Sequence, residues 1–441
     1  MILHRKMYDY LLEWRRKRGQ ECLFIKGARQ VGKTFLVEQF GNAEYESFIE
    51  VNFLKNPSLK GVFEGDLDSV EILKRLTAFL PGSRLAEGST LIFLDEIQKC
   101  SRARTALKFL AQDPRFDVIA SGSLLGLHYG QDADGEVEEV ESIPVGYERQ
   151  ITMYSLDFEE FLLACAYGTD VVGYLREHFD ACNAVPREIN DRYESLFREH
   201  MVVGGMPEAV DTFVSTNDFG EVQRVQEKIL ATYDDDIANH AKGAEKAKVR
   251  ACYRSVPMQL ARENKKFRYA SVEKRATARK FEGSIQWLED SGLVHVARNV
   301  REPMLPLRAN AKGGEFKLYV NDTGLLLAGY GEQTKLAVLC NTIRGSAKGG
   351  IYENAIAEAL VKAGYPLHYY KTEGSTMEIE FLVEREGEVE PVEVKAGNNS
   401  SASLDHFENR FAPETAFKLV NGNVGRFGNR VTLPHYMAMF L

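Results

Sequence analysis

The segment from Gly27 to Thr34, which reads GARQVGKT, constrains the fold of this chain more than any other segment. It matches the pattern G-x-x-x-x-G-K-[ST], in which glycines let backbone N–H groups curl around phosphate oxygens at the start of a helix. The apolar run Cys22–Lys26 precedes it and a helical pattern to Phe40 follows, as this loop requires. We therefore predict a phosphate-binding loop formed by Gly27, Ala28, Arg29, Gln30, Val31, Gly32, Lys33 and Thr34.

Two acidic residues follow a second apolar run, Thr90–Leu94. At the end of such a strand, Asp95 can reach a Mg²⁺ ion that the Thr34 hydroxyl also holds, while Lys33 neutralises the β- and γ-phosphates. Glu96 is placed to polarise the attacking water as a general base. The sequence therefore predicts ATP and Mg²⁺ as cofactors, and the alternative for Asp95 is a helix N-cap after a buried strand.

A third apolar run, Val118–Ser121, ends in the sequence Ser121-Gly122-Ser123. The hydroxyl groups of Ser121 and Ser123 would face a γ-phosphate or the attacking water, although a plain Ser-Gly turn is the alternative. Short apolar strands that alternate with helices predict a parallel α/β sheet, whose ligands bind at the carboxyl ends of the strands.

These three motifs together resemble the AAA-type ATPases of the bacterial and archaeal group whose C-terminal half is called DUF4143. Four further segments fit the resemblance: Ser155–Phe161 as the helix after the sensor, Gly204–Glu208 as a turn, Trp287–Leu293 and Tyr352–Asn354. The resemblance covers nearly the whole chain, although only the phosphate loop is specific by itself. It implies ATP hydrolysis by a P-loop domain.

The same resemblance suggests Arg149 as an arginine finger for the γ-phosphate, because an arginine follows the sensor strand in such families. A plain surface arginine is the alternative. Residues 131–142 carry six acidic and no basic side chains and look inserted relative to the family pattern, which puts the alignment of Arg149 in doubt. We predict that this acidic stretch is a solvated loop.

The charge of the chain is unevenly distributed. The formal net charge is −9, but residues 241–280 hold 13 basic and 3 acidic side chains, which leaves −19 for the rest. Tyr269–Val294 looks like the winged-helix segment of the family, with Lys274, Arg275, Arg279 and Lys280 at helical spacing. Such a segment would bind DNA or RNA through phosphate contacts, whereas a solvated helical face or a surface for protein contacts is the alternative.

The C-terminal region carries a helix with Glu353 and two strands that contain Glu378-Ile379-Glu380 and Glu393-Val394-Lys395, joined by a hairpin at Glu386-Gly387. Glu353, Glu380, Glu393 and Lys395 resemble the catalytic set of a PD-(D/E)xK nuclease, in which Glu380 and Glu393 would hold a metal ion. Glu380 stands where the family has aspartate, and its extra methylene moves the carboxylate by about an ångström. A retained but inactive fold is the alternative.

The predicted fold class is α/β: a P-loop NTPase parallel sheet followed by a helical and winged-helix module and a small restriction-endonuclease-like domain. The predicted boundaries are 1–165 for the ATPase, 166–244 for a helical region interrupted at Gly204–Pro207, 245–335 for the winged-helix-like module and 336–441 for the nuclease-like domain. The predicted function is an ATPase that couples its nucleotide state to a C-terminal domain acting on DNA or RNA. The alternative is a signalling switch whose inactive nuclease-like domain binds a protein.

The chain lacks the apolar runs of a signal peptide or a membrane span, and its six cysteines follow no metal-site or disulfide spacing. These features predict a cytoplasmic protein that has no membrane partner. The sequence leaves homo-oligomerisation open.

Overall fold

The structure is a computed structural model that describes residues 2–17, 21–123, 146–241, 243–372, 374, 377–397 and 401–441. The acidic stretch 131–142 lies outside the described residues. The chain divides into two compact units, which are described separately. The N-terminal unit is His4–Tyr154 with Asp290–Gly292, and the C-terminal unit is mainly Ser155–Glu289 and Leu293–Leu441.

The N-terminal unit is built on a five-stranded sheet in the order β2-β3-β4-β1-β5, and all its strand pairs are parallel. Its strands are β1 (Cys22–Gly27), β2 (Ser47–Asn52), β3 (Thr90–Asp95), β4 (Asp117–Ser123) and β5 (Glu148–Thr152). Its helices are α1 (Lys6–Lys17), α2 (Lys33–Glu44), α3 (Ser69–Phe79) and α4 (Ser101–Ala111), with short 3₁₀ helices η1 (Pro57–Phe63) and η2 (Ile97–Lys99). The three predicted strands are confirmed.

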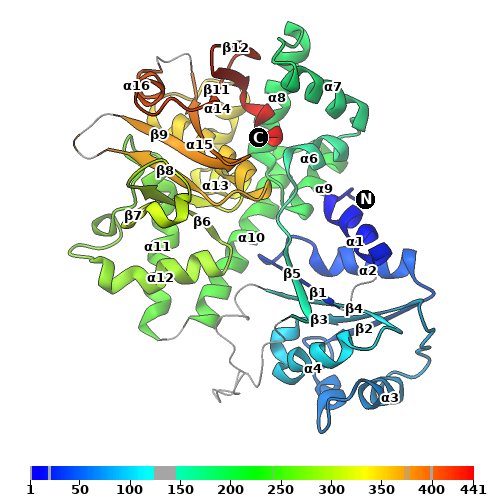
Figure 1. Ribbon diagram of the computed structural model, residues 1–441. Coiled ribbons are helices and arrows are strands. Elements are labelled where there is room, and N and C mark those ends of the chain that lie inside the picture. The colour runs from blue at the N-terminus through cyan, green and yellow to red at the C-terminus, as the bar shows by residue number, and fades with distance from the viewer. Residues whose placement is uncertain are drawn as a thin grey trace. The chain divides into compact units, whose positions relative to one another are not determined.

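Helices cover both faces of this sheet: α1 and α2 lie on one face, and α3 and α4 on the other (Figure 1). Strand β3 is buried on both faces, since every one of its residues is buried. This explains why the sequence shows continuous apolar runs rather than alternation. The crossovers bring the carboxyl ends of β1, β3 and β4 to one edge, where the predicted motifs lie.

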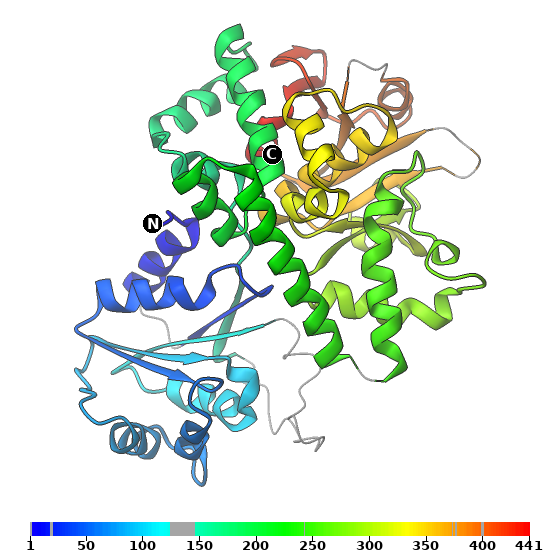
Figure 2. The ribbon, with the colours of Figure 1, turned by 180° about the vertical axis from the view of Figure 1, so that it is seen from behind.

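The first part of the C-terminal unit is helical. Its helices are α6 (Phe158–Ala164), α7 (Thr169–Asp180), α8 (Arg187–Val203), α9 (Pro207–Thr216), α10 (Phe219–His240) and α11 (Ala244–Leu260). A capping box begins α6, because the Glu160 backbone N–H donates to the Asp157 side chain at 2.9 Å and the Asp157 backbone N–H donates to the Glu160 side chain at 3.1 Å. Helices α10 and α11 run beside each other (Figure 2).

The predicted break at Gly204–Pro207 is confirmed between α8 and α9, and its cause is a close approach of the backbone. The Leu156 N–H donates to the carbonyl of Gly205 at 2.7 Å, and a Cβ on Gly205 would lie 2.0 Å from the Leu156 oxygen. Only glycine fits this position. The turn therefore fixes the chain directly after it leaves the N-terminal unit.

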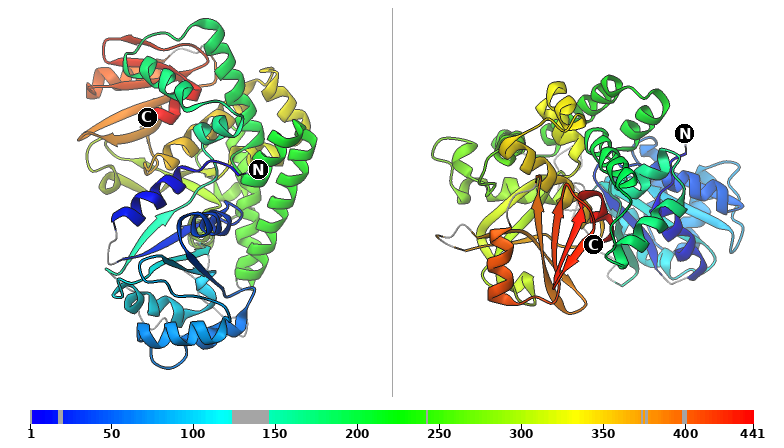
Figure 3. Two further views of the ribbon diagram at one scale, coloured as in Figure 1. Left: turned by 90° about the vertical axis from the view of Figure 1, so that its right-hand side faces the viewer. Right: turned by 90° about the horizontal axis from the view of Figure 1, so that it is seen from above.

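The rest of the C-terminal unit surrounds an eight-stranded mixed sheet in the order β12-β13-β11-β10-β9-β8-β6-β7 (Figure 3). Its strands are β6 (Val294–Val300), β7 (Ala311–Val320), β8 (His368–Lys371), β9 (Glu378–Arg385), β10 (Glu388–Lys395), β11 (Ala416–Val420), β12 (Gly425–Phe427) and β13 (Arg430–Pro434). Its α-helices are α12 (Ala278–Asp290), α13 (Thr323–Tyr330), α14 (Glu332–Leu339), α15 (Gly345–Lys362) and α16 (Ala402–Phe411). The 3₁₀ helices are η3 (Tyr269–Ser271), η4 (Leu307–Asn310) and η5 (His435–Phe440).

In this sheet, strands from both sides of the expected boundary between residues 335 and 336 pair with each other. Strand β6 pairs with β7 on one side and with β8 on the other, so the strands of the predicted winged-helix-like module continue the sheet of the predicted nuclease-like domain. Both edges of β6 are hydrogen-bonded, and separating the two regions would expose one of them. The predicted hairpin at Glu386-Gly387 is confirmed by the antiparallel β9–β10 pair.

Candidate functional site

The phosphate loop joins the end of β1 to the start of α2. The Lys33 ammonium donates to the carbonyl oxygens of Gly27 at 3.1 Å and Ala28 at 2.8 Å, so it lies inside the curve of the loop. Burial lowers its pKa to about 8, and the nearby Glu96 and Asp95 carboxylates oppose this shift. Gly32 begins the helix with a φ of 92°, a backbone conformation that glycine adopts without strain. The predicted residues thus form one continuous turn at a helix N-terminus, a geometry that suits an anion.

The loop is packed against the segment that follows β5. The Met153 N–H donates to the carbonyl of Lys26 at 2.7 Å, and a Cβ on Gly27 would lie 2.3 Å from the Met153 oxygen. Gly27 is therefore needed for this close approach of the two backbones.

Arg5, just before α1, forms hydrogen bonds with both the phosphate loop and the segment that follows β5. Its guanidinium is buried and donates to the carbonyl of Val31 at 3.0 Å and to that of Tyr154 at 2.7 Å. The first of these carbonyls belongs to the phosphate loop and the second follows β5. Arg5 therefore fixes the loop to the end of the sheet.

We expect Arg5→Ala to weaken ATP binding about tenfold, since one charge-assisted hydrogen bond contributes about 1.5–3 kcal/mol. Arg5→Lys should recover part of this loss because it restores a charged donor. Titration with a fluorescent ATP analogue measures the effect, and Arg16→Ala, an exposed change in α1, is the matched control. Unchanged affinity in a folded Arg5→Ala protein would contradict the positioning role.

Asp95 is the centre of a hydrogen-bond network at the carboxyl edge of the sheet. Its Oδ2 accepts from Thr34 Oγ1 at 3.0 Å and from Asn52 Nδ2 at 2.7 Å, and its Oδ1 accepts from Ser121 Oγ. Burial raises the pKa of Asp95, and the hydrogen bonds from Ser121 and Thr34 oppose that rise. Thr34 and Asp95 thus present two adjacent oxygen ligands of the kind that Mg²⁺ prefers.

Glu96 lies beside this network but is held separately. Its backbone is left-handed, with a φ of 55°, and its carboxylate accepts from Gln98 Nε2. The same amide nitrogen lies 3.4 Å from Ser123 Oγ. Glu96 and Ser123, both predicted as site residues, are therefore linked through a residue that the sequence analysis missed.

Asn52 and Gln98 are the two polar partners that sequence reasoning did not find. Asn52 ends β2, whose register pairs it with Asp95 on β3. A polar residue at the end of the apolar-polar run Ser47–Asn52 was the available signal. Gln98 carried no signal, because its position depends on the turn at Glu96.

Arg149 is not brought to the phosphate loop, which corrects its predicted role as an arginine finger within this chain's own site. Arg149 lies on β5 opposite Leu23 of the parallel strand β1. Because Leu23 comes four residues before Gly27, Arg149 lies toward the amino ends of the strands, away from the phosphate loop. Its side chain is 49% exposed and forms an ion pair with Glu21 at 3.0 Å. The alternative, a surface arginine, agrees with this geometry.

The C-terminal carboxylates gather on one face of the eight-stranded sheet. The β9–β10 register that pairs Val392 with Phe381 sets Glu393 beside Glu380, and Lys395 contacts both, at 3.1 Å and 3.5 Å respectively. Burial raises the pKa of Glu380 to about 7, although Lys395 opposes this. The predicted set is thus brought together.

The metal ligands predicted there do not fit a divalent ion, because ammonium groups already face the carboxylates. Glu353 on α15 contacts Lys265 at 2.8 Å and Lys317 at 3.5 Å. Among the residues that the structure describes, no three His, Cys, Asp or Glu side chains are grouped as a metal site requires. The predicted metal binding by Glu380 and Glu393 therefore does not fit this arrangement of charges.

The basic block 241–280 is partly neutralised. Lys248 pairs with Glu245, Lys266 with Glu315 and Lys280 with Glu273. Lys274, Arg275 and Arg279 stay exposed. In the part of the chain that the structure describes, they pair with no acidic side chain. They lie at the turn before α12 and in its first turn, where a helix N-terminus favours phosphate groups.

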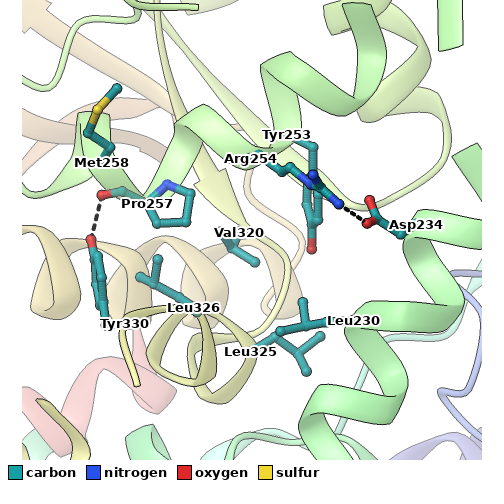
Figure 4. Close-up of a pocket in the computed structure, with 11 residues that line it drawn as sticks. Leu230, Asp234, Tyr253, Arg254, Pro257, Met258, Val320, Leu325, Leu326 and Tyr330 are labelled. Atoms are coloured by element: carbon teal, nitrogen blue, oxygen red, sulfur yellow. Dashed lines mark hydrogen bonds and ion pairs between the residues drawn. The ribbon is translucent and has the colours of Figure 1, made fainter. Parts of the chain in front are cut away.

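A concavity of about 440 Å³ lies among α10, α11 and α13 of the C-terminal unit (Figure 4). Its lining is mainly apolar and includes Leu230, Leu325 and Leu326. An Asp234–Arg254 ion pair lies at one end, and Tyr330 donates to the Pro257 carbonyl at 2.6 Å at another. The charged groups that line this concavity, Asp234 and Arg254, are thus paired with each other.

No helix in the described ranges is long and apolar enough to cross a membrane.

The parallel sheet, the phosphate loop and the Thr34–Asp95 pair define a P-loop ATPase domain of the AAA class. Residues 19–162 match the family model described as an AAA domain, and residues 348–433 match the domain of unknown function DUF4143. Between them, residues 194–335 match a second domain of unknown function, DUF8612. The chain therefore carries a region that matches an AAA domain and, C-terminal to it, a region that matches DUF4143.

Solved structures show more distant likenesses. A Walker-type ATPase of Pyrococcus abyssi is 14% identical, with a TM-score of 0.43, over 75% of this chain and 96% of that one. DnaA of Aquifex aeolicus bound to AMPPCP is 16% identical, with a TM-score of 0.29, over 65% of this chain and 88% of that one. PCH-2 of C. elegans is 11% identical, with a TM-score of 0.26, over 48% of this chain and 62% of that one. No curated protein matches the sequence.

Proposed function

We propose that this protein is a Mg²⁺-dependent ATPase whose nucleotide state controls the binding of DNA or RNA by its C-terminal unit. The observation that carries the proposal is the carboxyl edge of the N-terminal sheet, where Lys33, Asp95 and Glu96 gather at the phosphate loop. The match to an AAA domain supports the same activity.

The chain's own residues supply each part of the hydrolysis. Lys33 and the N–H groups of the loop bind the β- and γ-phosphates, and Thr34 and Asp95 would hold Mg²⁺, which neutralises the charge that develops on the phosphate oxygens. Glu96 orients and deprotonates the attacking water, and Gln98 holds the Glu96 carboxylate in position. Ser121 and Ser123 would contact the γ-phosphate or the water.

A short covalent connection supports coupling between the units. Within the N-terminal unit and beside the phosphate loop, Met153 is hydrogen-bonded to Lys26, and Tyr154 is hydrogen-bonded to Arg5. Within the C-terminal unit, Leu156 is bonded to Gly205, and its carbonyl accepts from Lys362 on α15 at 2.8 Å. Residues 153–156 thus connect the phosphate loop to α15, so a displacement of the loop would be passed along these four residues to that helix. The same helix carries Glu353.

Lys274, Arg275 and Arg279 support nucleic-acid binding, because basic side chains in this exposed position can contact phosphates without breaking ion pairs. Changing all three to glutamine should weaken DNA or RNA binding and reduce the slope of log K against log salt by about 3. Fluorescence anisotropy over a salt series measures both effects. The matched control changes three exposed basic residues on other helices of the unit to glutamine: Arg187, Arg224 and Lys228. Equal affinity and slope in the two triple variants would contradict the assignment.

A second candidate is a nucleotide-dependent switch whose C-terminal unit binds a protein. The observation in its favour is the set of lysines that neutralises the carboxylates of the nuclease-like region. Stoichiometric recovery of one protein, with no nucleic acid, would favour this candidate over the first.

A further inference from the structure

Lys317 on β7 has an unusual environment for an ammonium group. Its side chain is 1% exposed, and its Nζ lies 2.7 Å from Glu378 Oε1 and 3.5 Å from Glu353 Oε2. The same atom lies 4.9 Å from the centre of the Tyr369 ring, on whose face the charge is attracted. A buried charge persists only when it is paired in this way.

The lysines of the cluster around Lys317 equal its carboxylates in number. Four lysines face the four carboxylates: Lys265 contacts Glu353, Lys371 contacts Glu378, Lys395 contacts Glu380 and Glu393, and Lys317 contacts Glu353 and Glu378. A divalent cation added to this set would have to displace an ammonium or be buried with excess positive charge. Either change is costly in a buried site.

The electrostatics of the acids agree with this arrangement. Burial raises the pKa of Glu378, but Lys317 and Lys371 overcome that effect and bring it down to about 2. For Glu353 the pKa is also lowered, because Lys317 and Lys265 outweigh the effect of burial. Both carboxylates are therefore ionised at neutral pH, and the lysine ammonium groups balance their negative charge.

We propose that the Lys317 ammonium is the resident cation of this cluster, occupying the position of a divalent metal, and that the C-terminal unit works without one. The cluster Glu353, Glu378, Glu380 and Glu393 then has a structural role, joining α15 to β7, β9 and β10. This inference is independent of ATP hydrolysis and of nucleic-acid binding. It predicts that removing the ammonium creates a divalent-cation site.

The test is Mn²⁺ binding to the full-length, nucleotide-free protein, followed by electron paramagnetic resonance. Wild type should bind no Mn²⁺ through the cluster, whereas Lys317→Met, which keeps a long unbranched side chain, should gain a site. Glu378→Gln in the Lys317→Met background should remove the gain, and Lys317→Arg, which keeps the positive charge, should not produce it. All variants share the same phosphate loop, so Mn²⁺ held there contributes equally to each of them.

Two results would overturn the proposal. One is a wild-type Mn²⁺ site that Glu378→Gln abolishes, which would mean that metal displaces Lys317 in the natural protein. The other is a folded Lys317→Met protein that binds no more Mn²⁺ than wild type. If Lys317→Met is unstable, Mn²⁺ should raise its melting temperature and leave that of Lys317→Arg unchanged, because a ligand stabilises the state that binds it. The comparison of wild type with Glu378→Gln does not depend on whether Lys317→Met folds.

Discussion

Lys33→Ala is expected to abolish detectable ATP hydrolysis and to weaken ATP binding. Lys33 is the buried cation within the phosphate loop, and removing one such donor from a site of developing charge lowers kcat by about 10²–10³-fold. A coupled phosphate-release assay measures kcat, and titration with a fluorescent ATP analogue measures affinity.

The matched control for Lys33 is Lys74→Ala, which removes an exposed lysine of α3 in the same unit. This control should hydrolyse ATP at the wild-type rate. Hydrolysis by Lys33→Ala at that rate would show that the active site lies elsewhere in the chain.

Glu96→Gln is expected to separate binding from hydrolysis. The substitution keeps the size of the side chain but removes the base, and general-base catalysis contributes about 10²–10⁴-fold to the rate. ATP should therefore bind with near wild-type affinity and remain unhydrolysed. Rapid quench of a single turnover measures the chemical step directly.

Glu87→Gln, a change at a 70% exposed residue of the same unit, is the control for Glu96→Gln. A Glu96→Gln protein that hydrolyses ATP at the wild-type rate would mean that another group activates the water. A protein that no longer binds ATP would mean that Glu96 is needed for the structure of the loop.

The phosphate loop could be predicted from sequence because all its residues lie in one run of eight, so local spacing alone defines the site. Asp95 and Ser121 were found for a related reason: each ends an apolar strand, and parallel strands end at one edge of a sheet. Arg5 could not be found, since its contact with Val31 depends on how α1 packs on the sheet.

The C-terminal unit was harder to predict because its contacts join distant segments. Glu380, Glu393 and Lys395 were grouped correctly from strand alternation and one hairpin turn. Lys317 was missed, since it reaches the cluster from β7, more than sixty residues before β9. The pairing of β6 with β8 could not be predicted either, because it joins strands on opposite sides of the expected boundary at residue 335.

Coupling between nucleotide state and nucleic-acid binding is the central claim, and one affinity comparison tests it most directly. Binding of labelled DNA and RNA to Glu96→Gln would be measured at fixed low salt with ATP and Mg²⁺, and again without nucleotide. The account predicts that the affinity for at least one of these nucleic acids changes about fivefold or more, with a reciprocal change in ATP affinity. Equal nucleic-acid affinity in the two states, or no binding in either, would contradict it.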